Sequence, residues 1–190
     1  MSALPDGAGP VLVNLARSAI AADLGLDPPP PVAVKDDRWL DEPGASFVTL
    51  RLDTALRGCI GSLQAYRPLR KDVAGNAHAA AFQDPRFPDL SRGEYADVSI
   101  EVSVLTAPEP LAFWSREEAL AKLVPGRDGV VLTAAGRRAT FLPQVWEELP
   151  EPEDFLRHLM LKAGLVADHW DDSVRLDTYR VTAFEEPQAR

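Results

Sequence analysis

Residues 47–61 read FVTLRLDTALRGCIG, and their pattern decides the fold. Over residues 47–53 apolar side chains alternate with polar ones, which is the period of a strand with one buried face. Residues 53–55 are typical of a short turn, after which the alternation resumes. The stretch therefore predicts two paired strands, with Leu56 and Ile60 of the second facing the core.

The same alternation places Arg57 and Cys59 together on the opposite face of the second strand. A neighbouring guanidinium favours thiolate over thiol, and the glycines at positions 58 and 61 allow a ligand or another backbone to come close. A nucleophilic or substrate-binding Cys59 is one interpretation. We favour the other, a small buried side chain packed beside glycines, because the sequence assigns no base to the thiol.

Helical and strand-like patterns alternate along the rest of the chain. Ser115 and Glu118 form the capping-box pattern of a short helix, and Pro143 is expected to open a helical turn. Apolar residues at helical spacing predict longer helices at residues 10–24, at residues 68–82 beginning with Pro68, and at residues 152–164. Alternation predicts further strands at residues 97–105, 129–133, 138–142 and 174–184.

The segment Pro28 to Pro31 separates the first helix from this region. Four consecutive prolines favour polyproline II and predict a stiff linker. Strands and helices that interleave irregularly, without an internal repeat, are typical of an α+β or mixed α/β fold. With 190 residues and 46% hydrophobic content, residues 1–190 are most simply one domain, with room for a small subdomain.

Composition argues against several classes of protein. The formal net charge of -9 is unfavourable for gripping phosphate backbones, and the short basic runs at residues 67–71 and 137–138 are typical of solvated helix starts or hairpin tips. A single cysteine and an N-terminus without a basic, apolar leader predict a cytoplasmic protein. No apolar stretch approaches the roughly 20 residues that span a bilayer.

The sequence contains no motif for binding a metal ion or a nucleotide cofactor. The chain has three histidines, none with the close spacing of metal ligands, and it lacks a Gly-rich phosphate loop. We therefore expect neither a metal nor a cofactor.

His78 and Glu101 are the candidates for proton transfer beside Cys59. His78 lies on the predicted helix of residues 68–82 but off its apolar stripe, so an exposed helix histidine is the favoured interpretation. Glu101 interrupts an apolar strand and shares a face with Ser99 and Ser103. It marks either a cleft or an ordinary salt bridge to Arg57 or Arg51.

Two further segments carry candidate binding residues. Asp84 and Arg86 stand in a stiff, proline-bounded loop that either presents a binding surface or only ends the preceding helix. Thr140 and Gln144 flank a strand-to-helix turn, where free amides can receive an anion.

Taken together, these residues resemble the AMMECR family, which includes component A of the microbial AmmeMemoRadiSam system. The resemblance extends over roughly residues 10–186 in order. It rests on segments that occupy residues 56–61, 76–87, 101–105, 136–146 and 155–165, reading LRGCIG, NAHAAAFQDPRF, EVSVL, GRRATFLPQVW and FLRHLMLKAGL.

Membership of that family implies an α+β fold with a mainly antiparallel sheet, packed helices, and a larger and a smaller subdomain. The hexapeptide of residues 56–61 would lie at a cleft between them. Microbial relatives are linked to a Memo-like protein and a radical S-adenosylmethionine enzyme, which would be the partners. The resemblance implies no known reaction.

These observations lead to one main expectation and two alternatives. The chain is expected to be a cytosolic accessory domain that binds a small anionic or polar ligand, or a partner protein. In the first alternative it is an enzyme with Cys59 as nucleophile, activated by Arg57 and served by His78 or Glu101; in the second it is a nucleic-acid adaptor. The candidate ligand-binding residues are Arg57, Gly58, Cys59, Gly61, Asp84, Arg86, Glu101, Thr140 and Gln144.

Overall fold

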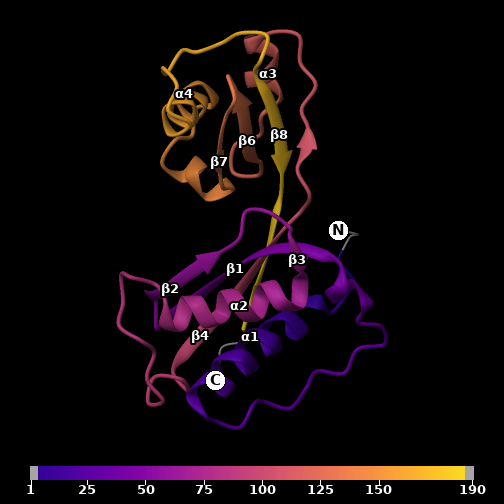
Figure 1. Cartoon of the computed structure of the whole chain (residues 1–190), viewed down its shortest axis with the longest axis vertical. Coiled ribbons are helices and arrows are strands. Elements are labelled where there is room, and N and C mark those ends of the chain that lie inside the picture. Colours follow the sequence, from indigo (N-terminus) through magenta and orange to yellow (C-terminus); the bar gives the residue numbers. More distant parts are fainter. Residues whose placement is uncertain (1–3, 187–190) are drawn as a thin grey trace. The chain divides into compact units, whose positions relative to one another are not determined.

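The computed structural model describes residues 4–186, which form two compact units (Figure 1). Of the described residues, the larger unit contains 4–105 and 182–186, and the smaller one contains 106–181. Each unit has its own hydrophobic core. Helices and mainly antiparallel sheets confirm the predicted α+β fold with a larger and a smaller part.

The larger unit is a sheet with two helices packed against it. The strand order is β2-β1-β4-β9, and β3 pairs with the start of β1. Val48 and Leu50 of β1 and Val102 of β4 belong to one buried core with residues of both helices. The elements are α1 (Ala8–Leu24), β1 (Pro43–Leu52), β2 (Ala55–Gly61), β3 (Arg67–Pro68), α2 (Leu69–Phe82), β4 (Val98–Leu105) and β9 (Val181–Glu185).

The hairpin of β1 and β2 forms as predicted but contains an irregularity. Leu50 pairs with Gly58 and the next residue of β1, Arg51, pairs with Leu56, so Arg57 is an extra residue on β2. Ile60 packs against the core, as expected. Leu56 is 37% exposed, so its predicted burial is wrong, because the extra residue interrupts the alternation of the strand.

The predicted C-terminal strand, residues 174–184, is two strands in different sheets. The first half is β8 (Arg175–Tyr179), which pairs with β5 and β6, and the second half is β9, which neighbours β4. Between them the backbone of Arg180 bonds twice to Thr106, through its carbonyl oxygen and its N–H. The sequence pattern runs on through this point because both halves are strands, so periodicity cannot detect the change of partner.

The smaller unit combines a sheet of order β5-β8-β6-β7 with short helices. Ser115 caps α3 by accepting a hydrogen bond from the Glu118 N–H, as predicted. In the core the Trp146 ring stacks on Phe155 at a centroid distance of 3.7 Å. The elements are β5 (Glu109–Pro110), α3 (Arg116–Lys122), β6 (Gly129–Ala134), β7 (Arg137–Phe141), the 3-10 helix η2 (Pro143–Glu147), α4 (Pro152–Lys162) and β8.

The segments that connect these elements explain two smaller features. Residues 26–34, which include the four prolines, lie outside helices and strands, and Asn14 donates a hydrogen bond to the Pro30 carbonyl oxygen. They lead to the 3-10 helix η1 (Arg38–Asp41). Pro68 belongs to β3 and is the N-cap of α2, so the helix begins one residue later than predicted. In the described part of the chain, no helix combines the length and apolarity that crossing a membrane requires.

Candidate functional site

A row of three polar residues crosses the larger sheet at Cys59. Strand β1 lies between β2 and β4, and its Thr49 is paired with Cys59 on one side and with Glu101 on the other. Because Val48 and Leu50 point into the core with the helices, the alternation of the strand directs Thr49 to the opposite face. Two strand spacings separate Cys59 from Glu101 by roughly 10 Å. We call Cys59, Thr49 and Glu101 the polar row.

The immediate surroundings of the Cys59 thiol contain a hydroxyl group. The Thr49 Oγ1 lies 3.4 Å from Sγ, and within residues 4–186 no other side chain is within hydrogen-bonding distance of the sulfur. At the far end of the row Glu101 accepts a hydrogen bond from Ser103 Oγ at 3.1 Å. Among the described residues neither Arg51 nor Arg57 forms an ion pair with Glu101, so the anticipated salt bridge is not formed.

The buried Arg57 is bound elsewhere. Its Nε lies 2.8 Å from Glu94 Oε1, and its terminal nitrogens donate to the carbonyl oxygens of Pro88 and Asp89 at 2.9 and 3.2 Å. The hydrogen bond from Arg57 is the main reason that the pKa of Glu94 falls from 4.5 to about 2. The guanidinium therefore holds the loop between α2 and β4 against β2.

Asp84 and Arg86 bind the backbone of Cys59 instead of lining an open loop. The Cys59 N–H donates to Asp84 Oδ2 at 2.9 Å, and Arg86 donates to the Cys59 carbonyl oxygen at 3.3 Å and to the Asp84 carboxylate at 2.6 Å. The bonds from Arg86, with that from the Cys59 N–H, hold the pKa of Asp84 well below its usual range. Since β2 is an edge strand, the two side chains satisfy backbone groups that a neighbouring strand would otherwise pair.

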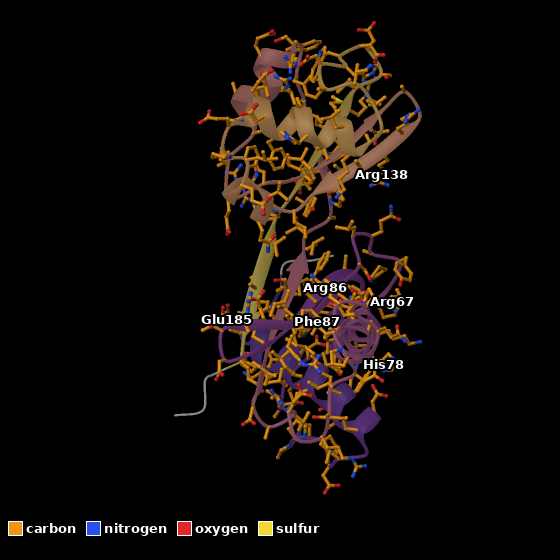
Figure 2. The ribbon with its side chains drawn as sticks, turned by 90° about the vertical axis from the view of Figure 1, so that its left-hand side faces the viewer. Arg67, His78, Arg86, Phe87, Arg138 and Glu185 are labelled. Carbon is orange, nitrogen blue, oxygen red and sulfur yellow. The ribbon has the colours of Figure 1, made fainter. Side chains whose placement is uncertain are left out.

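In the segment from Asp84 to Phe87, Arg86 is the charged residue that remains accessible. Its side chain is 54% exposed, and its guanidinium lies over the Phe87 ring at 5.4 Å from the centroid (Figure 2). The guanidinium beside Cys59 is thus that of Arg86, which the sequence placed in a separate loop.

The two glycines of the hexapeptide are required by packing. A Cβ on Gly58 would lie 2.1 Å from the carbonyl oxygen of Ala80 in α2, so only glycine lets β2 approach the helix this closely. A Cβ on Gly61 would meet the ring of Phe47 at 2.2 Å.

His78 does not form the Cys-His pair of the enzyme hypothesis. Its Nδ1 lies 2.7 Å from Asp23 Oδ2 of α1, and its Nε2 lies 3.1 Å from Gln83. The helix that carries it, α2, packs on the face of the sheet opposite to the polar row. The histidine links α1 and α2, and its side chain, labelled in Figure 2, is 42% exposed.

Sequence reasoning missed a buried carboxylate at the end of β2. Asp72 is fully buried and accepts hydrogen bonds from the Ser46 N–H and Oγ, Ser62 Oγ, Arg67 Nε and Asn76 Nδ2. This network ties α2 to β1 and to the segment that follows β2. Arg67, whose side chain is 29% exposed, is therefore a partner in this network rather than part of a solvated basic run. No local sequence pattern predicts this buried carboxylate, because its hydrogen-bond partners come from different elements.

The remaining candidates, Thr140 and Gln144, belong to the smaller unit. Thr140 Oγ1 lies 3.1 Å from the Tyr179 hydroxyl, and burial is the main cause that raises the pKa of that phenol. Gln144 lies exposed on η2. Over residues 4–186, no group of three or more His, Cys, Asp or Glu side chains is arranged to hold a metal ion.

Comparison with known proteins identifies the family. The AMMECR1 family model matches residues 13–184. A protein of Saccharolobus islandicus is 37% identical over 189 residues, covering 94% of this chain and 81% of its own, and a protein of Thermofilum pendens is 39% identical over 180 residues, covering 85% and 81%.

A solved structure extends the comparison to three dimensions. The crystal structure of the uncharacterised protein PH0010 from Pyrococcus horikoshii superimposes with a TM-score of 0.75 at 36% identity, covering 96% of this chain and 93% of that one. The resemblance inferred from the hexapeptide and the other segments is confirmed along almost the whole chain. The protein belongs to the AMMECR1 family.

Proposed function

We propose that this protein is an accessory domain that binds a ligand or a partner protein through the polar row and the surface around residues 56–61. The observation that carries the proposal is that some residues of this region make structural contacts while others remain accessible. Arg57, Gly58 and Gly61 make structural contacts, whereas Cys59 and Glu101 remain partly exposed on the sheet face opposite the helices. A rigid scaffold that presents a few polar groups is suited to recognition.

The enzyme alternative has less support. A nucleophilic cysteine needs a base that takes the proton of the thiol, and none of the candidates is free for this role. Arg57 is bound to Glu94, His78 is bound to Asp23, and Arg86, the guanidinium beside Cys59, is bound to Asp84. Thr49, the side chain beside the sulfur, has no basic group.

The partners we propose follow from the resemblance to component A of the AmmeMemoRadiSam system. They are a Memo-like protein and a radical S-adenosylmethionine enzyme. The polar row would form part of the contact with one of them.

The test is direct binding between purified proteins from one organism, measured by calorimetry and size-exclusion chromatography. Cys59→Ala is expected to retain the complex, because the hydrogen bond of the thiol is made to Thr49 of the same sheet. Glu101→Lys is expected to weaken it, because a reversed charge within an interface opposes association. Asp27→Lys supplies the matched control: the same change of charge at an exposed site in the segment after α1.

Weakened binding of Glu101→Lys alone would support the proposed surface. Equal affinity of all three variants would mean that the interface lies elsewhere. If the unmodified chain formed no complex with either protein, the proposed partners would be wrong. Loss of the complex in Cys59→Ala would favour the alternative in which the thiol has a chemical role.

A further inference from the structure

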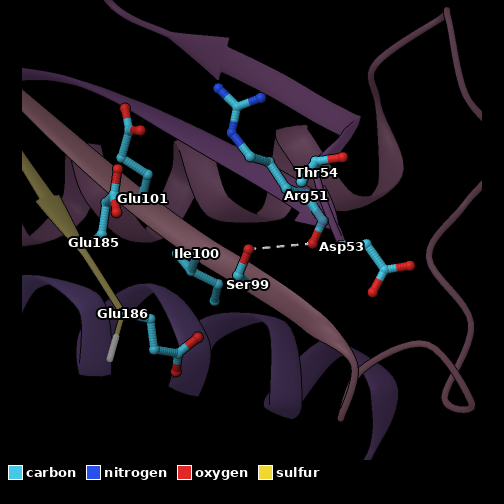
Figure 3. A pocket seen from close by; sticks show the side chains of 8 residues that line it. All are labelled: Arg51, Asp53, Thr54, Ser99, Ile100, Glu101, Glu185 and Glu186. Atoms are coloured by element: carbon cyan, nitrogen blue, oxygen red, sulfur yellow. Dashed lines mark hydrogen bonds between the residues drawn. The ribbon is translucent and has the colours of Figure 1, made fainter. Parts of the chain in front are cut away.

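Beside the polar row, the larger unit has a cavity of about 380 Å³ (Figure 3). That volume lies within the range of small-molecule sites. Strands β1, β4 and β9 and the turn between β1 and β2 contribute to it. Its lining residues are Arg51, Asp53, Thr54, Ser99, Ile100, Glu101, Glu185 and Glu186.

Opposite charges face this cavity without being paired to each other. Arg51, Glu101 and Glu185 leave the sheet on the same side, as Figure 3 shows, whereas Glu186 points away and is bound to Arg17. Within residues 4–186 the side chains of Arg51 and Glu185 have no hydrogen-bond or ion-pair partner, and Glu101 has only the Ser103 hydroxyl. One cavity thus holds a guanidinium and two carboxylates that form no ion pair within the described residues.

The two carboxylates are neighbours on adjoining strands. The Glu186 N–H donates to the Ile100 carbonyl oxygen at 2.9 Å, so Glu185 and Glu101 each lie one residue from this hydrogen bond. Like charges side by side on a sheet face are destabilising when nothing lies between them. A cationic group bound between them would remove this repulsion.

Arg51 stands on the other side of the same space. It is paired with Ser99, and Thr49 is paired with Glu101, so Arg51 and Glu101 are diagonal neighbours across β1 and β4. Such positions are about 7–8 Å apart. The guanidinium can bind a carboxylate or phosphate through two parallel hydrogen bonds.

We propose that the cavity binds a small zwitterion, with its oxyanion on Arg51 and its ammonium or guanidinium group between Glu101 and Glu185. This inference rests on the binding role proposed above and names the class of ligand. The two can fail separately, because complex formation with partner proteins and titration with a small molecule are independent measurements.

The distance between Arg51 and the two carboxylates can be tested with a series of probes of increasing length. Unbranched amino acids with the amine at the far end, from glycine through 4-aminobutanoate to 6-aminohexanoate, increase the distance between ammonium and carboxylate step by step. Hexanoate and hexylamine each carry only one of the two charges. Binding is followed by NMR through the backbone amides of Arg51, Ser99, Glu101 and Glu185 in the full-length protein.

The expected result is saturable binding in the millimolar range that is tightest for the longer amino acids and weaker for both singly charged probes. Arg51→Gln and Glu185→Gln should each weaken the best probe by about tenfold, since each removes one charged contact. Arg138→Gln, an exposed arginine at the start of β7, should leave it unchanged (Figure 2).

Three results would overturn the proposal: no saturable binding by any member of the series, equal binding by hexylamine and 6-aminohexanoate, or equal affinity of the variants and the unmodified protein. Both substituted side chains are exposed and unpaired, so the variants are expected to fold. The length series on the unmodified protein tests the proposal without any variant.

Discussion

Replacement of Gly58 by alanine should destabilise the larger unit severely. The added Cβ would lie 2.1 Å from the carbonyl oxygen of Ala80 and 3.1 Å from its carbonyl carbon. Both are backbone atoms of α2, so no side chain can rotate away. To reach an ordinary contact, β2 and α2 must separate by about 1 Å, which disturbs the close packing of the core between them.

Overpacking of this kind costs about 1–3 kcal/mol when side chains can adjust. Because backbone must move here, we expect the upper end, about 3 kcal/mol, which is a large part of the roughly 5–15 kcal/mol that stabilises a typical domain. Urea unfolding followed by circular dichroism should show a midpoint lower by about 1 M or more. Hydrogen exchange of peptides from β2 and α2 would assign the loss to the larger unit.

Gly93→Ala is the matched control. Its Cβ would meet nothing nearer than Ser91 Oγ at 3.8 Å, so its effect should stay within about 0.5 kcal/mol. If Gly58→Ala unfolded at the same urea concentration as this control, the strand and helix could separate at little cost. The hexapeptide glycine would then need an explanation other than packing.

Three further predictions test the contacts around this region. Asp72→Ala should cost about 3 kcal/mol in urea unfolding, because it leaves the buried Ser46 N–H and Arg67 Nε without their acceptor; a small cost would mean that water replaces the carboxylate. The pKa of Glu94 is depressed from 4.5 to about 2, so its ion pair stabilises the fold above pH 4.5 and that contribution is lost as the pH falls toward 2. Glu94→Gln should lack this part of the acid dependence, and parallel stability profiles of variant and unmodified protein would contradict the assignment. His78→Ala should leave the alkylation rate of Cys59 by iodoacetamide unchanged, and a slower reaction would indicate that the histidine acts on the thiol after all.

Local patterns in the sequence were sufficient for most of the secondary structure. The alternation over residues 47–61 predicted the β1–β2 hairpin, and helical spacing predicted α1, α2 and α4 to within two residues at each end. Ser115 was identified as a helix cap because a capping box involves residues only three apart. Such features depend on near neighbours in the chain, so they can be read without knowing the fold.

The candidate site was only partly predictable for the same reason. The hexapeptide and the segment from Asp84 to Phe87 were both singled out, but their connection through the Cys59 backbone was not. The partner of Arg57 is Glu94, which lies 37 residues away in a turn without periodicity. A pattern of alternating side chains predicts which face of the sheet a residue occupies. It does not predict which charged residue of another element contacts it.

By itself, the sequence determined most of the strands and helices, the buried face of β1 and the family. Only the tertiary structure decided that residues 174–184 divide between two sheets, that Asp72 is buried, and that Arg51 and Glu185 share a cavity with Glu101. These outcomes depend on the order of strands in a sheet and on how closely layers pack. Hydrophobic periodicity is the same for every strand order, so residues distant in the chain find their partners only when the whole sheet has formed.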